Sequence, residues 1–228
     1  MLRAVIFDFD GVIADSELLH YKALNAVFNL HGVDISKEVH WQKYLGYTDL
    51  ENIEAVNRDC NMHLSNSQIA ALMHRKAEIF AELVSQEDPI IPGVTEFVSM
   101  LVKHNIRRAI CSGALHIDIQ QMLSGSELKK AFEIIVAADD VSKGKPDPEG
   151  YWLAIEKLNK DETDPIRPSE CIVIEDSHWG LAAAAAAGMH TIAVTNTYSK
   201  EELIEKADKV VDRLDHLSRS DLTNICEN

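Results

Sequence analysis

The stretch Ile6-Phe7-Asp8-Phe9-Asp10-Gly11-Val12 decides the fold, because an apolar strand runs directly into two carboxylates two residues apart and then a glycine. Side chains alternate between the two faces of a strand, so Asp8 and Asp10 are expected to converge at its carboxyl end. Two such carboxylates repel each other unless a cation or a proton lies between them. The stretch therefore predicts a site for a metal ion and a nucleophile; the alternative is a strand that ends in a solvated acidic turn.

Residues 2–9 are apolar at nearly every position, which is typical of a strand buried on both faces of a parallel sheet. After residue 89, strand patterns alternate with helical ones. The further strands are expected at residues 107–111, 132–137, 171–174, 191–194 and 209–211. This alternation predicts an α/β fold, with a doubly wound parallel sheet covered by helices on both faces.

The segment between these parts, residues 16–88, has apolar residues at helical spacing and no convincing strand. Thr48 with Glu51 and Ser65 with Gln68 have the spacing of capping boxes, which mark the starts of helices. We therefore expect an α/β core domain of residues 1–15 and 89–228, with an inserted all-helical cap domain of residues 16–88.

The composition excludes several classes of protein. The 228 residues carry a formal net charge of −15, which would repel the phosphate backbones of nucleic acids. The four cysteines form no Cys-x-x-Cys pair, as is usual in a reducing compartment. The sequence enters a strand pattern directly, so we expect no leader before it. No apolar run approaches the roughly 20 residues of a membrane span. We expect a cytoplasmic protein that binds neither nucleic acid nor a membrane; the oligomeric state is not indicated, and a monomer is compatible with the sequence.

Polar residues that follow the expected strands are candidates for a single site, because ligands of open parallel sheets bind beyond the carboxyl ends of the strands. In chain order they are Asp8, Asp10, Ser112, Gly113, Lys145, Glu175 and Asp176. Several carboxylates can hold one Mg²⁺, and a hydroxyl and an ammonium can bind phosphoryl oxygens. The set therefore predicts phosphoryl transfer.

Each candidate can be given a chemical role. Asp8 is the candidate nucleophile, because an aspartate can form an aspartyl-phosphate. Asp10 can protonate the leaving oxygen and later activate water, which requires a raised pKa that acidic neighbours favour. Ser112 and Lys145 would bind the phosphoryl oxygens as a donor and a cation.

The four segments 8–12, 112–113, 145–146 and 175–176 resemble, in order and context, the four motifs of the haloacid dehalogenase (HAD) superfamily. The resemblance covers essentially the whole chain and implies a Rossmann-like core. The pair of aspartates resembles the phosphatases and phosphomutases of the superfamily. The insertion after the first strand is similar to the helical cap of the β-phosphoglucomutase-like and phosphoglycolate phosphatase-like subgroup.

The resemblance also implies a cofactor and its ligands. Mg²⁺ would be bound by Asp8, by the backbone carbonyl of Asp10 and by Asp176, with Glu175 binding directly or through water. The phosphoryl group would be held by Ser112, with its neighbour Gly113, and by Lys145, which would also offset the charge of the acidic cluster.

His20 and Lys76 resemble positions where sugar-phosphate mutases place residues of the substrate cleft. The alternatives are a solvated histidine and an exposed lysine on helices. Related mutases have an arginine three residues after the glycine of segment 45–49, and this chain has Asp49 there. A carboxylate cannot replace a planar bidentate donor. This difference favours a phosphatase acting on a small phosphorylated metabolite, such as a sugar or sugar-alcohol phosphate; a β-phosphoglucomutase-type mutase is the second candidate.

Binding functions compete with an enzyme. A receiver-like phosphorylation signalling module shares the acidic pocket, but its phosphorylated aspartate follows the third strand and it lacks an insertion of this size. A calcium-binding loop needs more oxygen ligands and a glutamate at its twelfth position, and residues 8–14 are too apolar for one. A catalytically silent relative is a further alternative, although all core catalytic residues are present.

Overall fold

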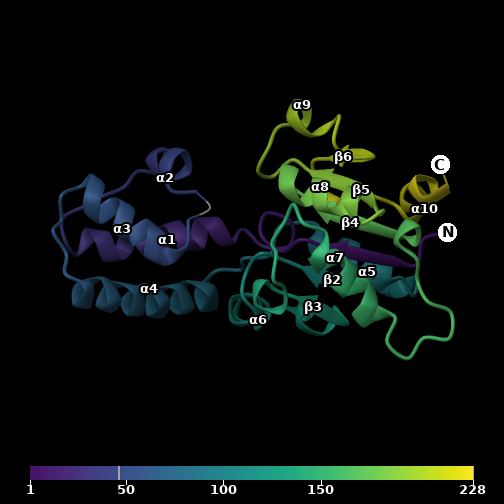
Figure 1. Ribbon diagram of the computed structural model, residues 1–228, viewed down its shortest axis with the longest axis horizontal. Coiled ribbons are helices and arrows are strands. Elements are labelled where there is room, and N and C mark those ends of the chain that lie inside the picture. Colours follow the sequence, from purple (N-terminus) through teal and green to yellow (C-terminus); the bar gives the residue numbers. More distant parts are fainter. Residues whose placement is uncertain (46, 228) are drawn as a thin grey trace. The chain divides into compact units, whose positions relative to one another are not determined.

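The structure, a computed structural model, describes residues 1–45 and 47–227. It consists of two compact units (Figure 1). The α/β unit comprises Met1–Asp15 and Ile90–Asn228, and the helical unit comprises Ser16–Pro89. The helical unit ends one residue later than the cap domain of residues 16–88 that is expected from the sequence, and it begins at the same residue.

The α/β unit contains a parallel sheet in the order β3-β2-β1-β4-β5-β6, which confirms the predicted doubly wound fold. The strands are β1 (Ala4–Phe7), β2 (Arg107–Cys111), β3 (Ile134–Val136), β4 (Cys171–Glu175), β5 (His190–Val194) and β6 (Lys209–Val211). The order proceeds from β1 through β2 to β3 on one side and from β4 to β6 on the other. The carboxyl ends of β1 and β4 thus flank the point where the order reverses, which is where such sheets bind ligands.

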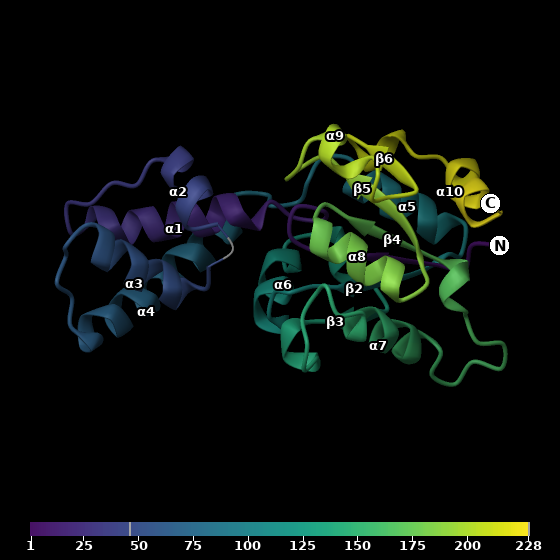
Figure 2. The same ribbon diagram turned by 45° about the horizontal axis from the view of Figure 1, so that its top comes forward.

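Helices cover both faces of this sheet (Figure 2). They are α5 (Val94–Lys103), α6 (His116–Leu123), α7 (Glu149–Leu158), α8 (His178–Ala186), α9 (Lys200–Leu203) and α10 (Arg219–Glu227). Short 3₁₀ helices span Glu127–Lys130, Ala138–Asp140, Pro168–Glu170 and Leu214–His216.

The alternation of side chains along β1 assigns the helices to faces. Ile6 packs with residues of α7 and α8, among them Tyr151 and the alanine pair Ala183 and Ala184. Phe7 points to the opposite face, where its ring lies 5.9 Å from the ring of Phe97 in α5. Because β1 is buried on both faces, it is apolar at consecutive positions, as its sequence indicated.

The helical unit contains α1 (Ser16–Asn29), α2 (Lys37–Lys43), α3 (Asp49–Asp59) and α4 (Asn66–Gln86). Both expected capping boxes are formed, with Thr48 opening α3 and Ser65 opening α4. Apolar residues of all these helices share one core, and α1 and α4 pack against each other along their length. In the described part of this unit, as expected, no strand occurs.

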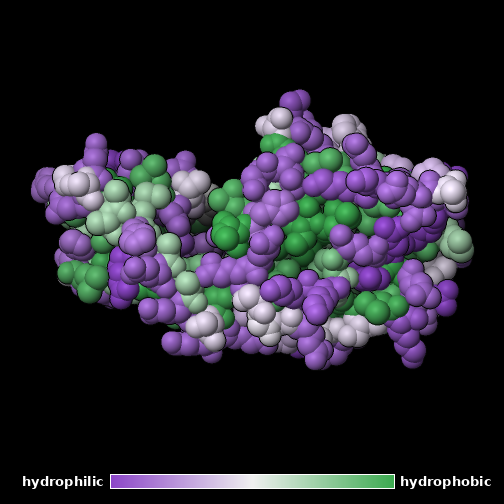
Figure 3. Space-filling model, turned by 90° about the horizontal axis from the view of Figure 1, so that it is seen from below, coloured by the Kyte–Doolittle hydropathy of each residue, from purple (hydrophilic) through white to green (hydrophobic). Residues whose placement is uncertain are grey.

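The surface is mostly hydrophilic on the face seen in Figure 3. Among residues 1–45 and 47–227, no helix combines the length and the hydrophobicity that crossing a bilayer requires.

Candidate active site

Three carboxylates meet where β1 and β4 end. The two strands are in register, with Phe7 opposite Ile174, and the Asp8 N–H donates to the Ile174 carbonyl at 2.9 Å. Glu175 is the last residue of β4, and Asp176 follows it. Asp8 therefore lies beside both. All three side chains are buried, and each offers an oxygen that lies within 4.8 Å of those of the others. The structure thus brings together three of the four predicted metal-binding residues.

Asp10 reaches this region by a different route from the one expected. β1 ends at Phe7, so Asp10 lies in a turn in which the N–H groups of Ile13 and Ala14 donate to the Phe9 carbonyl. Strand alternation therefore does not determine where Asp10 lies, and among the described residues its carboxylate is not one of the three that cluster. Burial is the main cause that raises the pKa of Asp8, and the charge of Asp10 raises it further.

Gly11 makes this turn possible. Its φ is +72°, a conformation that L side chains rarely adopt. A Cβ at this position would lie 2.0 Å from Oδ2 of Asp176. The backbone of the first loop can therefore approach the Asp176 carboxylate only because residue 11 is glycine.

Lys145 lies between two of the carboxylates. Its Nζ donates to Oδ1 of Asp8 at 2.7 Å and to Oε1 of Glu175 at 2.6 Å. Burial alone would lower the pKa of Lys145, but Asp8 and Glu175 outweigh it and keep the pKa well above its usual value. The predicted role of Lys145 in offsetting the acidic charge agrees with these contacts.

Glu175 is fully buried and bonded through both oxygens. Oε1 accepts from Lys145 and, at 3.1 Å, from the hydroxyl of Tyr151. Oε2 accepts from the N–H groups of Asp176 and Ser177 and from the Ser177 hydroxyl. Burial would raise the pKa of Glu175, but Lys145 and these donors bring it below its usual value. Glu175 is thus a charged anchor for Lys145.

The donor set fits a divalent cation. Asp8, Glu175 and Asp176 carry three negative charges when ionised, and Lys145 supplies one positive charge, which leaves a surplus of two. Without a cation this surplus is unfavourable: burial, followed by the charge of Glu175, raises the pKa of Asp176 to about 7. A cluster of buried carboxylate oxygens with this surplus matches the ligand preference of Mg²⁺.

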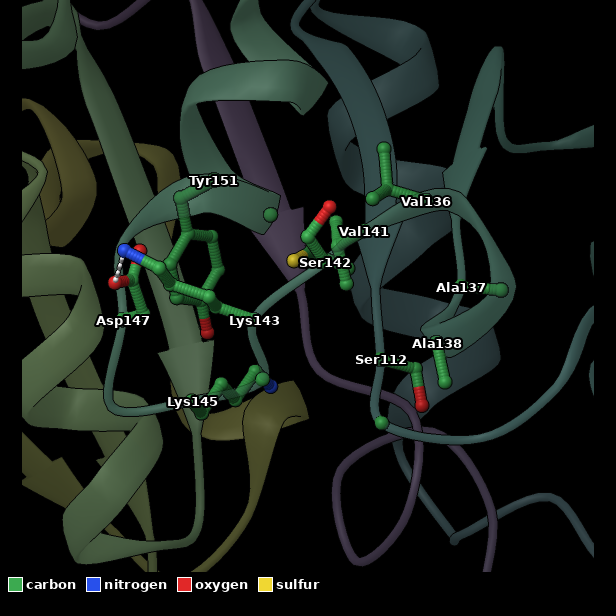
Figure 4. A pocket seen from close by; sticks show the side chains of 14 residues that line it. Ser112, Val136, Ala137, Ala138, Val141, Ser142, Lys143, Lys145, Asp147 and Tyr151 are labelled. Carbon is green, nitrogen blue, oxygen red and sulfur yellow. Dashed lines mark ion pairs between the residues drawn. The ribbon is translucent and has the colours of Figure 1, made fainter.

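A cavity of about 230 Å³ lies beside Lys145 and is also lined by Ser112 and Gly113 (Figure 4). Ser112 follows β2, and its N–H donates to the Val136 carbonyl at 2.9 Å. Its Oγ accepts from the Ala114 N–H, so the hydroxyl hydrogen can be donated to a ligand. A Cβ at Gly113 would meet no atom within 4 Å, so an anion can approach the backbone there. The structure thus places all three predicted phosphate-binding residues at one cavity.

His20, Lys76 and Asp49 form a separate polar cluster in the helical unit. Lys76 is only 2% exposed, and its Nζ lies 2.7 Å from Oδ2 of Asp49 and 2.7 Å from Nδ1 of His20. The His20 ring stacks on that of Phe80, with the centroids 4.3 Å apart. The alternative of an exposed helix lysine is therefore wrong, and His20 is at most partly solvated. Gly46, from which the position of the mutase arginine was counted, lies outside the described residues.

His20 should make the stability of the helical unit depend on pH. Burial, followed by the charge of Lys76, lowers the pKa of His20 from 6.5 to about 4. The unfolded chain then binds a proton near pH 6.5 that the folded chain binds only near pH 4, so stability falls as the pH drops between these values. We expect His20 to contribute a loss of up to about 3 kcal/mol over this range.

Urea unfolding of the wild type and of His20→Gln at pH 7.0 and pH 4.5 measures this loss. The glutamine variant should lose less stability than the wild type on acidification. Equal losses in the two proteins would show that His20 is not the group responsible.

Two parts of the site were missed at the level of the sequence. Tyr151 lies on α7 and bonds to Glu175, and nothing in its helical pattern distinguishes it from an ordinary core residue. Asn196 and Thr197 follow β5, and Thr197 donates a hydrogen bond to Asp176. Ligands bind beyond the carboxyl ends of parallel strands, so the residues that follow the expected strand 191–194 were candidates by the same rule.

A model of the haloacid dehalogenase-like hydrolases matches residues 5–194 of the chain. The chain belongs to this family. The match covers most of the α/β unit and the whole helical unit, and the predicted family membership is confirmed.

Individual members of the HAD family show the same relationship. The phosphorylated carbohydrates phosphatase of Thermotoga maritima is 30% identical to this chain, over 84% of both proteins. The β-phosphoglucomutase of Bacillus subtilis is 27% identical, over 85% of this chain and 83% of that protein. A crystal structure of CbbY from Rhodobacter sphaeroides in complex with xylulose-1,5-bisphosphate has a TM-score of 0.75 at 27% identity, covering 96% of this chain and 97% of that one. These relatives support the predicted subgroup and the predicted class of enzyme, a phosphoric monoester hydrolase.

Proposed function

We propose that this HAD hydrolase is a Mg²⁺-dependent phosphatase that hydrolyses a small phosphorylated metabolite, of the sugar or sugar-alcohol phosphate type, through an aspartyl-phosphate. The observation that carries the proposal is the position of Asp8. Its carboxylate is buried among Glu175, Asp176 and Lys145. This is an environment for a nucleophile that reacts with an anionic group, and it is a costly one for a structural aspartate.

The cation is assigned to the acidic cluster. Asp8, the backbone carbonyl of Asp10 and Asp176 would hold Mg²⁺, with Glu175 binding directly or through water. When bound, Mg²⁺ supplies positive charge that offsets both the carboxylates and the phosphoryl oxygens.

The chain's own residues carry out the two transfers. In the first, an Asp8 oxygen attacks phosphorus, the bond to the leaving oxygen breaks, and Asp10 gives that oxygen its proton. In the second, Asp10 takes a proton from water, whose oxygen attacks the same phosphorus and releases inorganic phosphate and the Asp8 carboxylate. Ser112 and Lys145 hold the remaining phosphoryl oxygens throughout.

The contacts of Asp49 favour hydrolysis over mutase activity. A mutase must also grip the phosphate that is not being transferred, which needs positive charge. Here Asp49 pairs with Lys76 at 2.7 Å, and the low pKa of His20, caused mainly by burial, keeps its ring neutral at pH 7. The cluster thus has no net positive charge. We assign to His20 and Lys76 the binding of uncharged hydroxyl groups of the substrate.

Removal of the metal tests this function. Phosphate release from a panel of sugar and sugar-alcohol monophosphates should require Mg²⁺, stop in excess EDTA and return when Mg²⁺ is restored. The reason is that the surplus negative charge of the site repels the substrate when no cation is bound. Undiminished release in excess chelator would contradict the metal assignment.

The mutase alternative is tested with β-glucose 1-phosphate and a trace of the corresponding 1,6-bisphosphate. Hydrolysis gives free phosphate, whereas rapid formation of glucose 6-phosphate would show that the enzyme is a mutase.

A further inference from the structure

The loop between β5 and α9, residues 195–199, is fixed at both of its ends. At one end the Thr195 N–H donates to the Val211 carbonyl of β6 at 3.1 Å. At the other end Ser199 and Glu202 form the capping box of α9. Between them, the ring of Tyr198 lies 4.3 Å from that of His178 in α8. The loop is thus held in place by the sheet and by two helices.

From this position the loop contacts both segments that carry the acidic cluster. The Asn196 side chain donates to the Gly11 carbonyl at 2.7 Å, next to the turn that carries Asp10. The Thr197 hydroxyl donates to Oδ2 of Asp176. The loop therefore fixes the first and the fourth motif relative to each other.

Oδ2 of Asp176 is enclosed by these contacts. A Cβ built on Gly11 would lie 2.0 Å from Oδ2 of Asp176 and 3.1 Å from the Thr197 hydroxyl oxygen. The Gly11 backbone and the Thr197 hydroxyl therefore both lie close to Oδ2. A cation would have to share Oδ2 with the Thr197 hydroxyl. Asp176 accordingly has one oxygen, Oδ1, that the loop does not engage.

We propose that Thr197 is a positioning residue that makes Asp176 a one-oxygen ligand and so favours Mg²⁺ over Ca²⁺. The inference rests on the proposed metal site. Mg²⁺ takes six ligands in a tight octahedron at about 2.0–2.1 Å, whereas Ca²⁺ takes six to eight oxygens and commonly binds both oxygens of a carboxylate. A hydroxyl that occupies one oxygen of Asp176 removes a ligand that Ca²⁺ can use and Mg²⁺ does not need.

The test compares Thr197→Val, which removes the hydroxyl, with Thr197→Ser, which keeps it. Titration calorimetry on the full-length, metal-free proteins gives the dissociation constants for Mg²⁺ and for Ca²⁺. In Thr197→Val the preference for Mg²⁺ over Ca²⁺ should fall by about tenfold or more, the usual size of effects from residues that support metal ligands. Thr197→Ser should keep the wild-type preference. Thr195→Val is the matched control, since Thr195 joins β6 through its backbone.

Each outcome of this test supports or overturns the inference. A preference that is unchanged in Thr197→Val would overturn the inference, as would equal weakening of both cations or a serine variant that behaves like the valine variant. Unfolding temperatures in EDTA that match the wild type would show that the variants are folded. A wild type that binds no Mg²⁺ would instead refute the proposed function itself, and the inference with it.

Discussion

Replacing Asp8 by asparagine is expected to abolish turnover, with a loss of at least about four orders of magnitude, as for other nucleophile replacements. The amide cannot attack phosphorus, although it has nearly the same shape as the carboxylate. The fold should persist, because burial raises the pKa of Asp8 well above its usual value and ionised Asp8 is thus not favourable to stability. Lys145 also keeps its second partner, Glu175.

Two measurements check this expectation. Phosphate release measures turnover, and intact-protein mass spectrometry after rapid quenching detects covalent phosphate, which should be found on the wild type alone. Asp139→Asn is the control, since Asp139 lies in the 3₁₀ helix after β3 and accepts from the His116 N–H outside the cluster. Turnover near the wild-type rate in a pure Asp8→Asn preparation would remove Asp8 from the role of nucleophile.

The sheet and the residues at its strand ends could be predicted because both follow from local patterns. A strand that is buried on both faces must be apolar at consecutive positions, so β1 and β4 stand out in the sequence. In a parallel sheet all carboxyl ends lie at one edge. The meeting of Asp8 with Glu175 and Asp176 then needs only that β1 and β4 be neighbours.

Other features depend on tertiary contacts that no local pattern records. The pairing of Lys76 with Asp49 joins α4 to the start of α3, and only their packing buries the lysine. The hydrogen bond from Tyr151 to Glu175 depends on how α7 lies against β4. An extension of β1 beyond Phe7 predicts that Asp10 shares a face with Asp8, whereas Asp10 lies in the turn formed by residues 9–14.

Lys145→Met should reduce both activity and stability, because its ammonium lies between Asp8 and Glu175 in a buried site. Removing one partner of a buried ion pair leaves the other charge uncompensated, which typically costs about 3–5 kcal/mol. We therefore expect destabilisation of this size at pH 7 in metal-free protein, together with a severe loss of phosphate release.

The pH dependence separates this charge effect from a packing defect. In the wild type, Lys145 keeps the pKa of Glu175 low, so Glu175 adds stability above its unfolded pKa of about 4.5 that is lost as the pH falls through the lower folded value. Burial already raises the pKa of Asp8 above its unfolded value in the wild type. Without Lys145, burial should also raise the pKa of Glu175 above its unfolded value and raise that of Asp8 further. The folded variant then takes up more protons than the folded wild type between pH 7 and pH 5, so it gains stability relative to the wild type over that range.

The stability difference between the wild type and Lys145→Met should thus shrink on acidification from pH 7 to pH 5, as measured by urea unfolding in EDTA. Lys143→Met is the matched control: this lysine, two residues earlier, is 71% exposed and pairs with Asp147 at 3.4 Å. An exposed pair contributes at most about 1 kcal/mol, so the control should be near wild type at both pH values. If the Lys145 variant lost the same stability at pH 5 as at pH 7, lost packing would explain it better than the unpaired carboxylates, and the balance of charge assigned to this site would be wrong.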